Sequence, residues 1–150
     1  MIGRFEKFSF AISEISRYWH KIAADEMDKY GLKGPYAVYF TTMYQYADGL
    51  TASQLCELCG RDKSDVSRAI AVMEKKGLVK KESVNQKLYR ARLTLTPEGR
   101  IAAEHINERA KLAVEFGGKG LSDEHREIFY NALDKISSNL HTLSEDGIPS

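Results

Sequence analysis

The chain has 150 residues, of which 43% are hydrophobic and 29% are charged. This composition is typical of a globular protein, and the length suits one domain or two closely joined lobes. No apolar run approaches the roughly 20 residues of a membrane helix, and the first ten residues lack the layout of a signal peptide. Two cysteines three residues apart cannot form a disulfide framework, so we expect a cytoplasmic protein.

The net charge is only +1, but the basic residues are concentrated in the middle of the chain. The segment from Arg61 to Arg92 contains ten Lys or Arg and four Asp or Glu, whereas the remainder contains 12 basic and 17 acidic residues. A basic centre between acidic flanks is the pattern expected of a surface that meets phosphate. An ordinary solvated charged surface is the alternative interpretation.

The first predicted element is a long helix over residues 4–30. Its apolar residues recur every three or four positions, which is the spacing of a seam that packs along other helices. They are Phe5, Phe8, Ile12, Ile15, Trp19 and Ile22. Gly31 is expected to end this helix. Pro35 is expected in the first turn of a second helix, which continues to about Asp48 and a turn at Gly49.

The next segment has the spacing of a helix-turn-helix. Where two helices cross steeply they need a small residue at the contact, then a glycine for the tight turn, then an apolar residue that plugs the second helix onto the first. Cys56, Gly60 and Val66 meet these requirements in that order. Such a module lays its second helix in the major groove of DNA.

The ends of these two helices also carry recognisable signals. Thr51 and Gln54 form a capping-box pattern at the start of the first, which is expected to run to about Cys59. Asp62 is expected to cap the second, which spans residues 63–76. Gly77 is expected to stop it.

A β-hairpin, or wing, is predicted to follow. Residues 78–83 and 90–96 read as strands, joined by a polar turn over residues 84–89. In the second strand Ala91, Leu93 and Leu95 alternate with polar residues, so one face of the hairpin is expected to be buried.

Two further helices complete the chain. Thr96 and Pro97 are expected to start a helix that reaches about Phe116, before a flexible break at residues 117–120. Ser122 is expected to start the last helix, whose apolar residues again lie three or four positions apart. They are Phe129, Leu133, Ile136, Leu140 and Leu143. The tail from Glu145 is expected to be disordered.

The apolar stripes of the terminal helices are too long for one small winged module to cover. We therefore expect these helices to pack together and to bury a two-fold dimer interface. A monomeric helical bundle that covers its own stripes is the alternative.

Several short strings resemble the MarR family of bacterial transcriptional regulators. They are Leu55-Cys56, where the family usually has Leu-Ala, then Val66-Ser67-Arg68, Lys76-Gly77-Leu78-Val79 and Leu95-Thr96-Pro97-Glu98-Gly99. The resemblance implies a mainly α fold, a winged helix-turn-helix with a two-stranded antiparallel wing and long flanking dimerisation helices. It implies a single domain over residues 1–150, with a DNA-binding lobe at about 33–99 and dimerisation helices at about 4–30 and 97–145. The wing lacks the acidic residue and two arginines often found in the family.

The second helix of the module suggests how DNA would be read. Val66, Ala69, Ile70 and Met73 are expected to face inward, and Ser64, Arg68, Ala71 and Lys75 outward. Arg68 could make a bidentate contact to guanine, although it could instead pair with Asp65 or Glu74. The candidate DNA-binding residues are Thr51, Ser53, Arg61, Lys63, Ser64, Ser67, Arg68, Lys75, Lys87, Arg90 and Arg92. A dimer would favour a pseudo-palindromic operator in double-stranded DNA.

The resemblance also implies a small, often aromatic effector that would bind between the DNA lobe and the dimer helices. The candidate pocket residues are Trp19, His20, Tyr36, Tyr39, Phe40 and Met43, with an ordinary core as the alternative. Effector binding would release DNA by a population shift.

Other chemistry has weak support in the sequence. Cys56 and Cys59 form a CxxC string that is either structural packing or a redox switch. The four histidines are scattered, so no metal site is expected, and no catalytic motif or cofactor site is present. We therefore expect a DNA-binding transcriptional regulator, a dimeric repressor relieved by an effector, with a redox-responsive regulator as the alternative.

Overall fold

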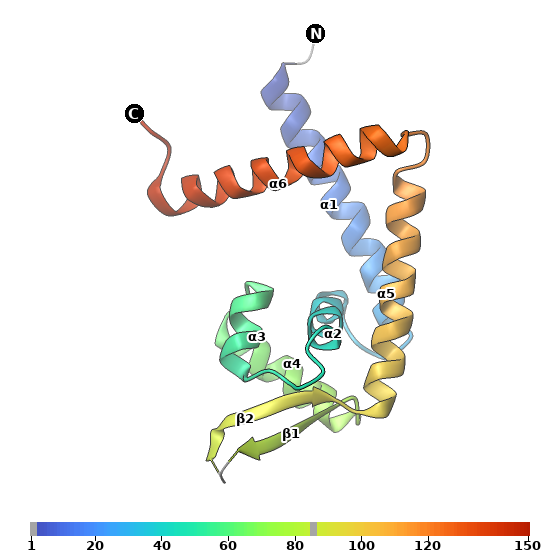
Figure 1. Ribbon diagram of the computed structural model, residues 1–150, viewed down its shortest axis with the longest axis vertical. Coiled ribbons are helices and arrows are strands. Elements are labelled where there is room, and N and C mark those ends of the chain that lie inside the picture. Colours follow the sequence, from blue (N-terminus) through green and yellow to red (C-terminus); the bar gives the residue numbers. More distant parts are fainter. Residues whose placement is uncertain (1–2, 85–86) are drawn as a thin grey trace. The chain divides into compact units, whose positions relative to one another are not determined.

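The computed structural model describes the backbone of residues 3–84 and 87–150, and the side chains of residues 3–83 and 91–150. Its elements in chain order are α1 (Arg4–Asp28), η1 (Gly34–Tyr36), α2 (Ala37–Tyr44), α3 (Ala52–Cys59), α4 (Lys63–Lys75), β1 (Val79–Val84), β2 (Lys87–Leu95), α5 (Pro97–Gly117) and α6 (Asp123–Asp146). The chain forms two compact units, Met1–Ala110 and Lys111–Ser150 (Figure 1). The expected fold class, mainly α with a two-stranded antiparallel wing, is confirmed.

The second helix is shorter than the sequence predicted. Its first turn is the 3-10 helix η1, with Pro35 at an N-terminal position, and α2 ends at Tyr44 rather than near Asp48. A turn replaces its last residues, because the amide of Gly49 donates to the carbonyl of Tyr46 at 2.9 Å and Gly49 has a φ of +95°. Such a φ favours glycine, so this turn breaks the helix earlier than the apolar pattern suggested.

The helix-turn-helix forms as its spacing predicted. The Thr51 side chain accepts from the Gln54 amide at 3.2 Å, and the Gln54 side chain accepts from the Thr51 amide at 2.9 Å. Gly60 ends α3 in the left-handed conformation, with a φ of +62°. Asp62 caps α4 by accepting from the Asp65 amide at 2.8 Å. Val66 is only 1% exposed beneath this turn.

The wing is an antiparallel hairpin that starts its second strand earlier than predicted. Val79 pairs with Leu95 at the base, and the register shifts between Glu82 and Val84. Because β2 begins at Lys87, residues 87–89 belong to the strand rather than to the expected turn. The loop before α3 joins the wing as well, since Leu50 and Leu93 exchange two backbone hydrogen bonds of 3.0 and 2.7 Å. This bridge ties the helix-turn-helix to the hairpin.

The start of α5 is fastened to the end of α4. The Thr96 hydroxyl donates to the carbonyl of Gly77 at 2.6 Å and accepts from the Gly99 amide at 3.0 Å. The Thr96 amide donates to the carbonyl of Leu78 at 3.0 Å. A Cβ atom at Gly99 would overlap that same carbonyl oxygen. The Leu-Thr-Pro-Glu-Gly string thus ends in a glycine because the backbone of α5 approaches the Leu78 carbonyl too closely there for any side chain.

The core of the first unit lies where these elements meet. Phe40, Leu55, Val66, Met73 and Ala103 are almost fully buried there. They come from α2, α3, α4 and α5, while Met27 adds the end of α1. The apolar face of each helix is therefore buried against the others, which leaves the opposite face of α4 open.

In the second unit, Arg126 of α6 holds the end of α5. Its guanidinium donates to the Glu115 carboxylate at 2.7 Å and to the carbonyl of Gly118 at 3.0 Å. The Ser122 side chain caps α6 by accepting from the His125 amide at 3.1 Å. The helix continues to Asp146. The prediction of a disordered tail from Glu145 is therefore wrong at its first residues, because Glu145 lies in the last helical turn of α6.

We predict that Gly99→Ala destabilises the protein. The added methyl group would force α5 away from the carbonyl of Leu78, and such overpacking typically costs about 1–3 kcal/mol. Chemical denaturation should show a lower midpoint. Gly117→Ala is the control, since a Cβ atom there meets nothing within 4 Å. Equal stabilities for the two variants would contradict this account of Gly99.

Candidate functional site

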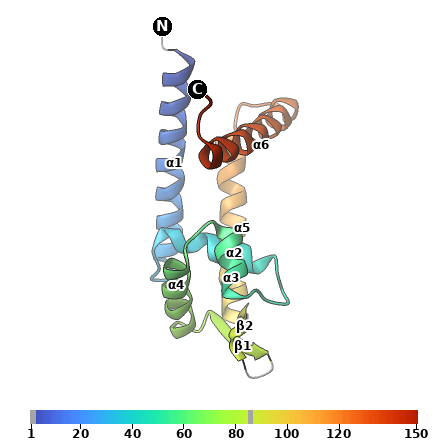
Figure 2. The same ribbon diagram turned by 90° about the vertical axis from the view of Figure 1, so that its left-hand side faces the viewer.

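One face of α4 is buried and the opposite face is exposed. Val66, Ala69, Ile70 and Met73 are at most 3% exposed, as their spacing predicted. Ser64, Arg68, Ala71 and Lys75 are all exposed on the other face; we call these four residues the α4 ridge. Figures 1 and 2 show α4 and the hairpin at the end of the first unit that lies farthest from the start of α1. A partner could therefore meet both elements at once.

Arg68 on this ridge has a partner within its own helix. Its guanidinium forms an ion pair with the Asp65 carboxylate one turn earlier, and the two side chains are 70% and 44% exposed. Exposed pairs of this kind contribute only about 0–1 kcal/mol. The pair orders Arg68 at the surface without preventing it from exchanging Asp65 for another acceptor.

The remaining predicted DNA-binding residues fall into four groups. Ser53, Arg61, Lys63 and Ser67 are exposed around the helix-turn-helix. Thr51 is partly buried, and its hydroxyl serves the cap of α3. Arg92 is exposed on β2 and donates to the carbonyl of Asp48 at 3.3 Å. The side chains of Lys87 and Arg90 lie outside the described residues.

A polar hollow of about 290 Å³ lies beside the first half of α4. It is lined by Lys33, Pro35, Tyr36, Tyr39, Arg61, Asp65 and Arg68. The rings of Tyr36 and Tyr39 meet edge to face, with their centroids 6.1 Å apart. Burial raises the pKa of Tyr39. Lys33 lies between the first two predicted helices and carries no sequence signal of a binding residue.

A second, apolar cavity of about 210 Å³ lies between α1, α2 and α5. Its lining residues are Trp19, Ile22, Ala23, Glu26, Met27, Ala37, Val38, Thr41, Ile106, Arg109 and Ala110. All of them belong to the first unit. Most of this wall is hydrocarbon, and the charged groups at its edge come from Glu26 and Arg109.

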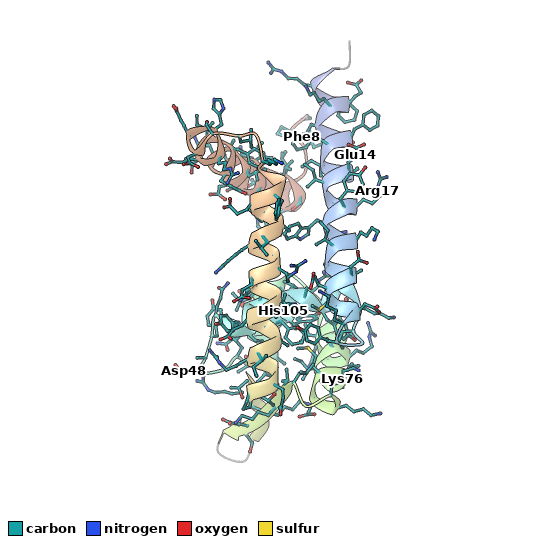
Figure 3. All side chains as sticks on the ribbon, turned by 90° about the vertical axis from the view of Figure 1, so that its right-hand side faces the viewer. Phe8, Glu14, Arg17, Asp48, Lys76 and His105 are labelled. Atoms are coloured by element: carbon teal, nitrogen blue, oxygen red, sulfur yellow. The ribbon has the colours of Figure 1, made fainter. Side chains whose placement is uncertain are left out.

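Glu26 is the centre of a charged cluster that links α1 to α5. Its carboxylate accepts from Lys29 at 2.8 Å and from Arg109 at 3.0 Å. His105, labelled on α5 in Figure 3, lies 3.7 Å from it. The Glu26 side chain is only 13% exposed. The hydrogen bond from Lys29, together with that from Arg109, lowers the pKa of Glu26 despite its burial.

The sequence signal for this cluster is a charged residue at an apolar position of each helix. Glu26 lies four residues after Ile22, so it occupies the next position of the apolar stripe in α1. Arg109 lies three residues after the buried Ile106, so it occupies the next apolar position of α5. A charge at an apolar position of a helix usually has a partner, because burying it alone is costly.

The six predicted effector residues do not line one cavity. Trp19 lines the apolar cavity, whereas Tyr36 and Tyr39 line the polar hollow. Phe40 and Met43 are core residues. His20 is exposed, 3.5 Å from the Ser16 hydroxyl. Trp19 and His20 are neighbours on α1 and therefore point in different directions, and Phe40 and Met43 pack in the core rather than lining either cavity.

The two cysteines lie on α3 as free thiols, and both are partly buried. The Cys59 thiol donates to the Thr42 hydroxyl at 3.5 Å. Burial raises the pKa of Cys59, which lowers the fraction of reactive thiolate at neutral pH. Within the described residues, no three His, Cys, Asp or Glu side chains gather as metal ligands. In the same part of the chain, every helix is too short or too polar to span a bilayer.

Comparisons with known proteins agree with this geometry. Residues 30–87 match the model of the MarR family, which confirms the resemblance predicted from the sequence. No curated protein matches the chain.

Solved structures share the fold over nearly the whole chain. A MarR family protein from Listeria monocytogenes, complexed with 26mer DNA, has a TM-score of 0.81 at 20% identity, over 100% of this chain and 99% of its own. A MarR transcriptional regulator from Methanosarcina mazei also has a TM-score of 0.81 at 20% identity, over 95% and 94%. The MepR–DNA complex of S. aureus has a TM-score of 0.79 at 21% identity, over 88% and 97%.

We predict that Glu26→Gln destabilises the protein at neutral pH but not in acid. The lowered pKa means that folding favours the ionised carboxylate, so its contribution is present above the ordinary carboxyl pKa of about 4.3 and is lost as pH falls through the lowered value. Urea unfolding at a series of pH values from 7 downward should show a difference that shrinks as pH falls below the ordinary carboxyl pKa. Asp25→Asn, which removes an exposed carboxylate paired with Lys21, should have little effect at any pH of the series. A Glu26→Gln difference that stays constant over the whole acid series would exclude an electrostatic origin.

Proposed function

We propose that this chain, whose winged-helix segment belongs to the MarR family, is a transcriptional regulator that binds specific duplex DNA as a homodimer. The exposed α4 ridge is the observation that carries this proposal. Small and polar side chains at its start allow close approach to base edges, and Arg68 can reach guanine. Two proteins of the same fold were solved as DNA complexes, which supports the proposal.

The two DNA-facing elements have distinct roles in this proposal. The ridge of α4 enters the major groove, and the wing approaches the neighbouring backbone. The basic segment from Arg61 to Arg92 supplies the cations, and these contacts fix the position of the protein on DNA. Arg68 supplies the sequence information, since its exposed guanidinium has further N–H donors to offer a base edge.

The terminal helices support the dimer. Phe5, Ile12 and Ile15 of α1 are 78%, 46% and 61% exposed. Ile128, Phe129 and Leu140 of α6 are also exposed. Solvent-facing stripes of this length mark interaction sites in soluble proteins. A two-fold interface would bury them and would present two recognition helices to a pseudo-palindromic operator.

We further propose that the protein is a repressor relieved by a small effector in the apolar cavity. A volume of about 210 Å³ is below the usual range for drug-sized ligands, so a single-ring compound fits it best. The cavity lies between α1, α2 and α5, so a ligand there could favour one arrangement of these helices over another. Differential affinity for the two arrangements would then shift DNA binding.

The redox alternative has less support. The raised pKa of Cys59 opposes thiolate formation, and Cys56 also packs against the core. A double Cys→Ser variant that still loses DNA on oxidation would exclude these thiols as the switch.

We predict that Arg68→Ala reduces the preference for specific DNA without affecting folding. The loss of one bidentate guanine contact corresponds to about 1–3 kcal/mol of discrimination. Gel-shift titration at fixed salt would measure it, on a duplex selected from a random pool. Arg4→Ala, an exposed arginine at the start of α1, is the control. Unchanged discrimination in Arg68→Ala would remove this residue from the recognition set.

We predict that the protein is a dimer at micromolar concentration. Ile15→Arg should weaken the dimer, because it places a charge in the proposed interface, and it should leave the monomer folded because Ile15 is exposed. Sedimentation would measure the mass, and Glu14→Arg would serve as the control. A wild-type monomer would support the self-covering bundle instead.

We predict that filling the apolar cavity abolishes the effector response. The probes are phenol, benzoate and indole, added to the protein–DNA complex at fixed salt. At least one should release DNA from the wild type, and Ala110→Phe should bind DNA normally but resist release. If an active probe releases both proteins equally, the effector acts elsewhere.

A further inference from the structure

The polar hollow beside α4 has two walls that are separate in the sequence. Lys33 and Tyr36 come from the segment around η1, and Arg61, Asp65 and Arg68 come from the turn and first half of α4. Tyr39, which is 3% exposed, forms its base. The hollow thus brings the start of the second helix next to Arg68, the proposed base-reading residue.

The charges of the hollow are unbalanced in favour of an anion. Its lining contains three cationic side chains and one carboxylate. That carboxylate, Asp65, is already paired with Arg68. No ion pair of Lys33 or Arg61 occurs among the described side chains. Two cations therefore face a hollow that has no carboxylate left for them.

Hydroxyl groups complete the set of donors. Tyr36 is partly buried in the wall, and a phenol hydroxyl can donate to an anionic oxygen. Two cations and a neutral donor around a polar space suit a phosphate group, whose oxygens accept several hydrogen bonds. Because Arg68 of the proposed DNA-binding ridge also lines this space, a phosphate of bound DNA is the nearest source.

We propose that this hollow binds one phosphodiester group of the DNA backbone through Lys33, Arg61 and Tyr36, while Asp65 keeps Arg68 out of the phosphate site and free to meet a base. The inference rests on the proposed DNA-binding function. It moves Tyr36 from the effector set to the DNA interface and adds Lys33 and Asp65.

Lys33, Arg61 and Arg68 all line the hollow, but only Arg68 is paired with Asp65, and this pair is the reason for assigning Arg68 a different role. A carboxylate close to DNA repels phosphate, so its presence reduces affinity for any sequence. By pairing with Arg68 it holds the guanidinium on the ridge. Without Asp65, Arg68 would gain access to the same phosphate as Arg61, and sequence-independent binding would increase relative to specific binding.

The first test is Lys33→Ala, with a duplex selected from a random pool and a scrambled duplex of the same composition. Loss of one phosphate contact should reduce the slope of log K against log salt by about 0.9 on both duplexes. The selected-to-scrambled affinity ratio should stay unchanged. Lys135→Ala, an exposed lysine of α6, should keep the wild-type slope.

The second test is Asp65→Asn with Asp62→Asn as its matched control. Both variants lose one negative charge at the start of α4, and asparagine caps a helix as well as aspartate does. Both should bind the scrambled duplex more tightly. Only Asp65→Asn should lower the selected-to-scrambled ratio, by several-fold, because only Asp65 contacts Arg68. Thermal melting would separate this effect from a loss of helix stability, which leaves the ratio unchanged.

The outcomes are distinct. An unchanged salt slope for Lys33→Ala, with wild-type DNA binding intact, would overturn the phosphate site. Inorganic phosphate, titrated at constant ionic strength, tests the other source: if Lys33→Ala loses phosphate binding but keeps the DNA slope, the hollow takes a free anion and the proposal is wrong. Equal selected-to-scrambled affinity ratios for Asp65→Asn and Asp62→Asn would overturn the role of Asp65. A wild type that binds neither duplex would refute the proposed function itself.

Discussion

The burial of one side of α4 is the constraint on which the rest of the structure depends. Val66, Ala69, Ile70 and Met73 are held against α2, α3, β1 and the start of α5 by the hydrophobic effect. Because a helix is rigid and has 3.6 residues per turn, burying this face fixes the direction of the opposite one. The orientation of Arg68 and its neighbours is therefore set by core packing rather than by any contact of their own.

Backbone contacts then connect the recognition helix to the wing. Thr96 and Gly99 fasten the start of α5 to the carbonyls of Gly77 and Leu78. Leu50 and Leu93 fasten the loop before α3 to β2. With both ends of the helix-turn-helix attached to the hairpin, the elements proposed to meet adjacent parts of a duplex form one packed lobe. A displacement of α5 would be transmitted to both.

Charged side chains lie at both proposed binding sites of the first unit, the apolar cavity and the polar hollow. Glu26 and Arg109 occupy apolar positions of α1 and α5 and pair beside the apolar cavity. Breaking such a pair is costly, because an uncompensated charge would remain poorly hydrated. The pair therefore connects α1 to α5 beside the cavity proposed for the effector. In the polar hollow, by contrast, cations exceed carboxylates, which suits an anionic partner.

The sequence by itself determined the elements and their caps, because these depend on residues a few positions apart. Thr51 with Gln54, Gly60, Asp62, Thr96 and Ser122 act locally, and the burial of Val66 and Met73 follows from helical spacing. The prediction from sequence made the second helix too long and β2 too short. Strand pairing involves distant residues, and Asp48 in the turn before Gly49 accepts a hydrogen bond from Arg92 of β2. Only the tertiary structure decided the grouping of side chains: it placed Tyr36 with Arg68 and Lys33, placed Trp19 with Glu26 and Arg109, and buried Phe40. Residues from two separate segments meet at the polar hollow and from three at the apolar cavity, and no local pattern encodes which of them will face the same space.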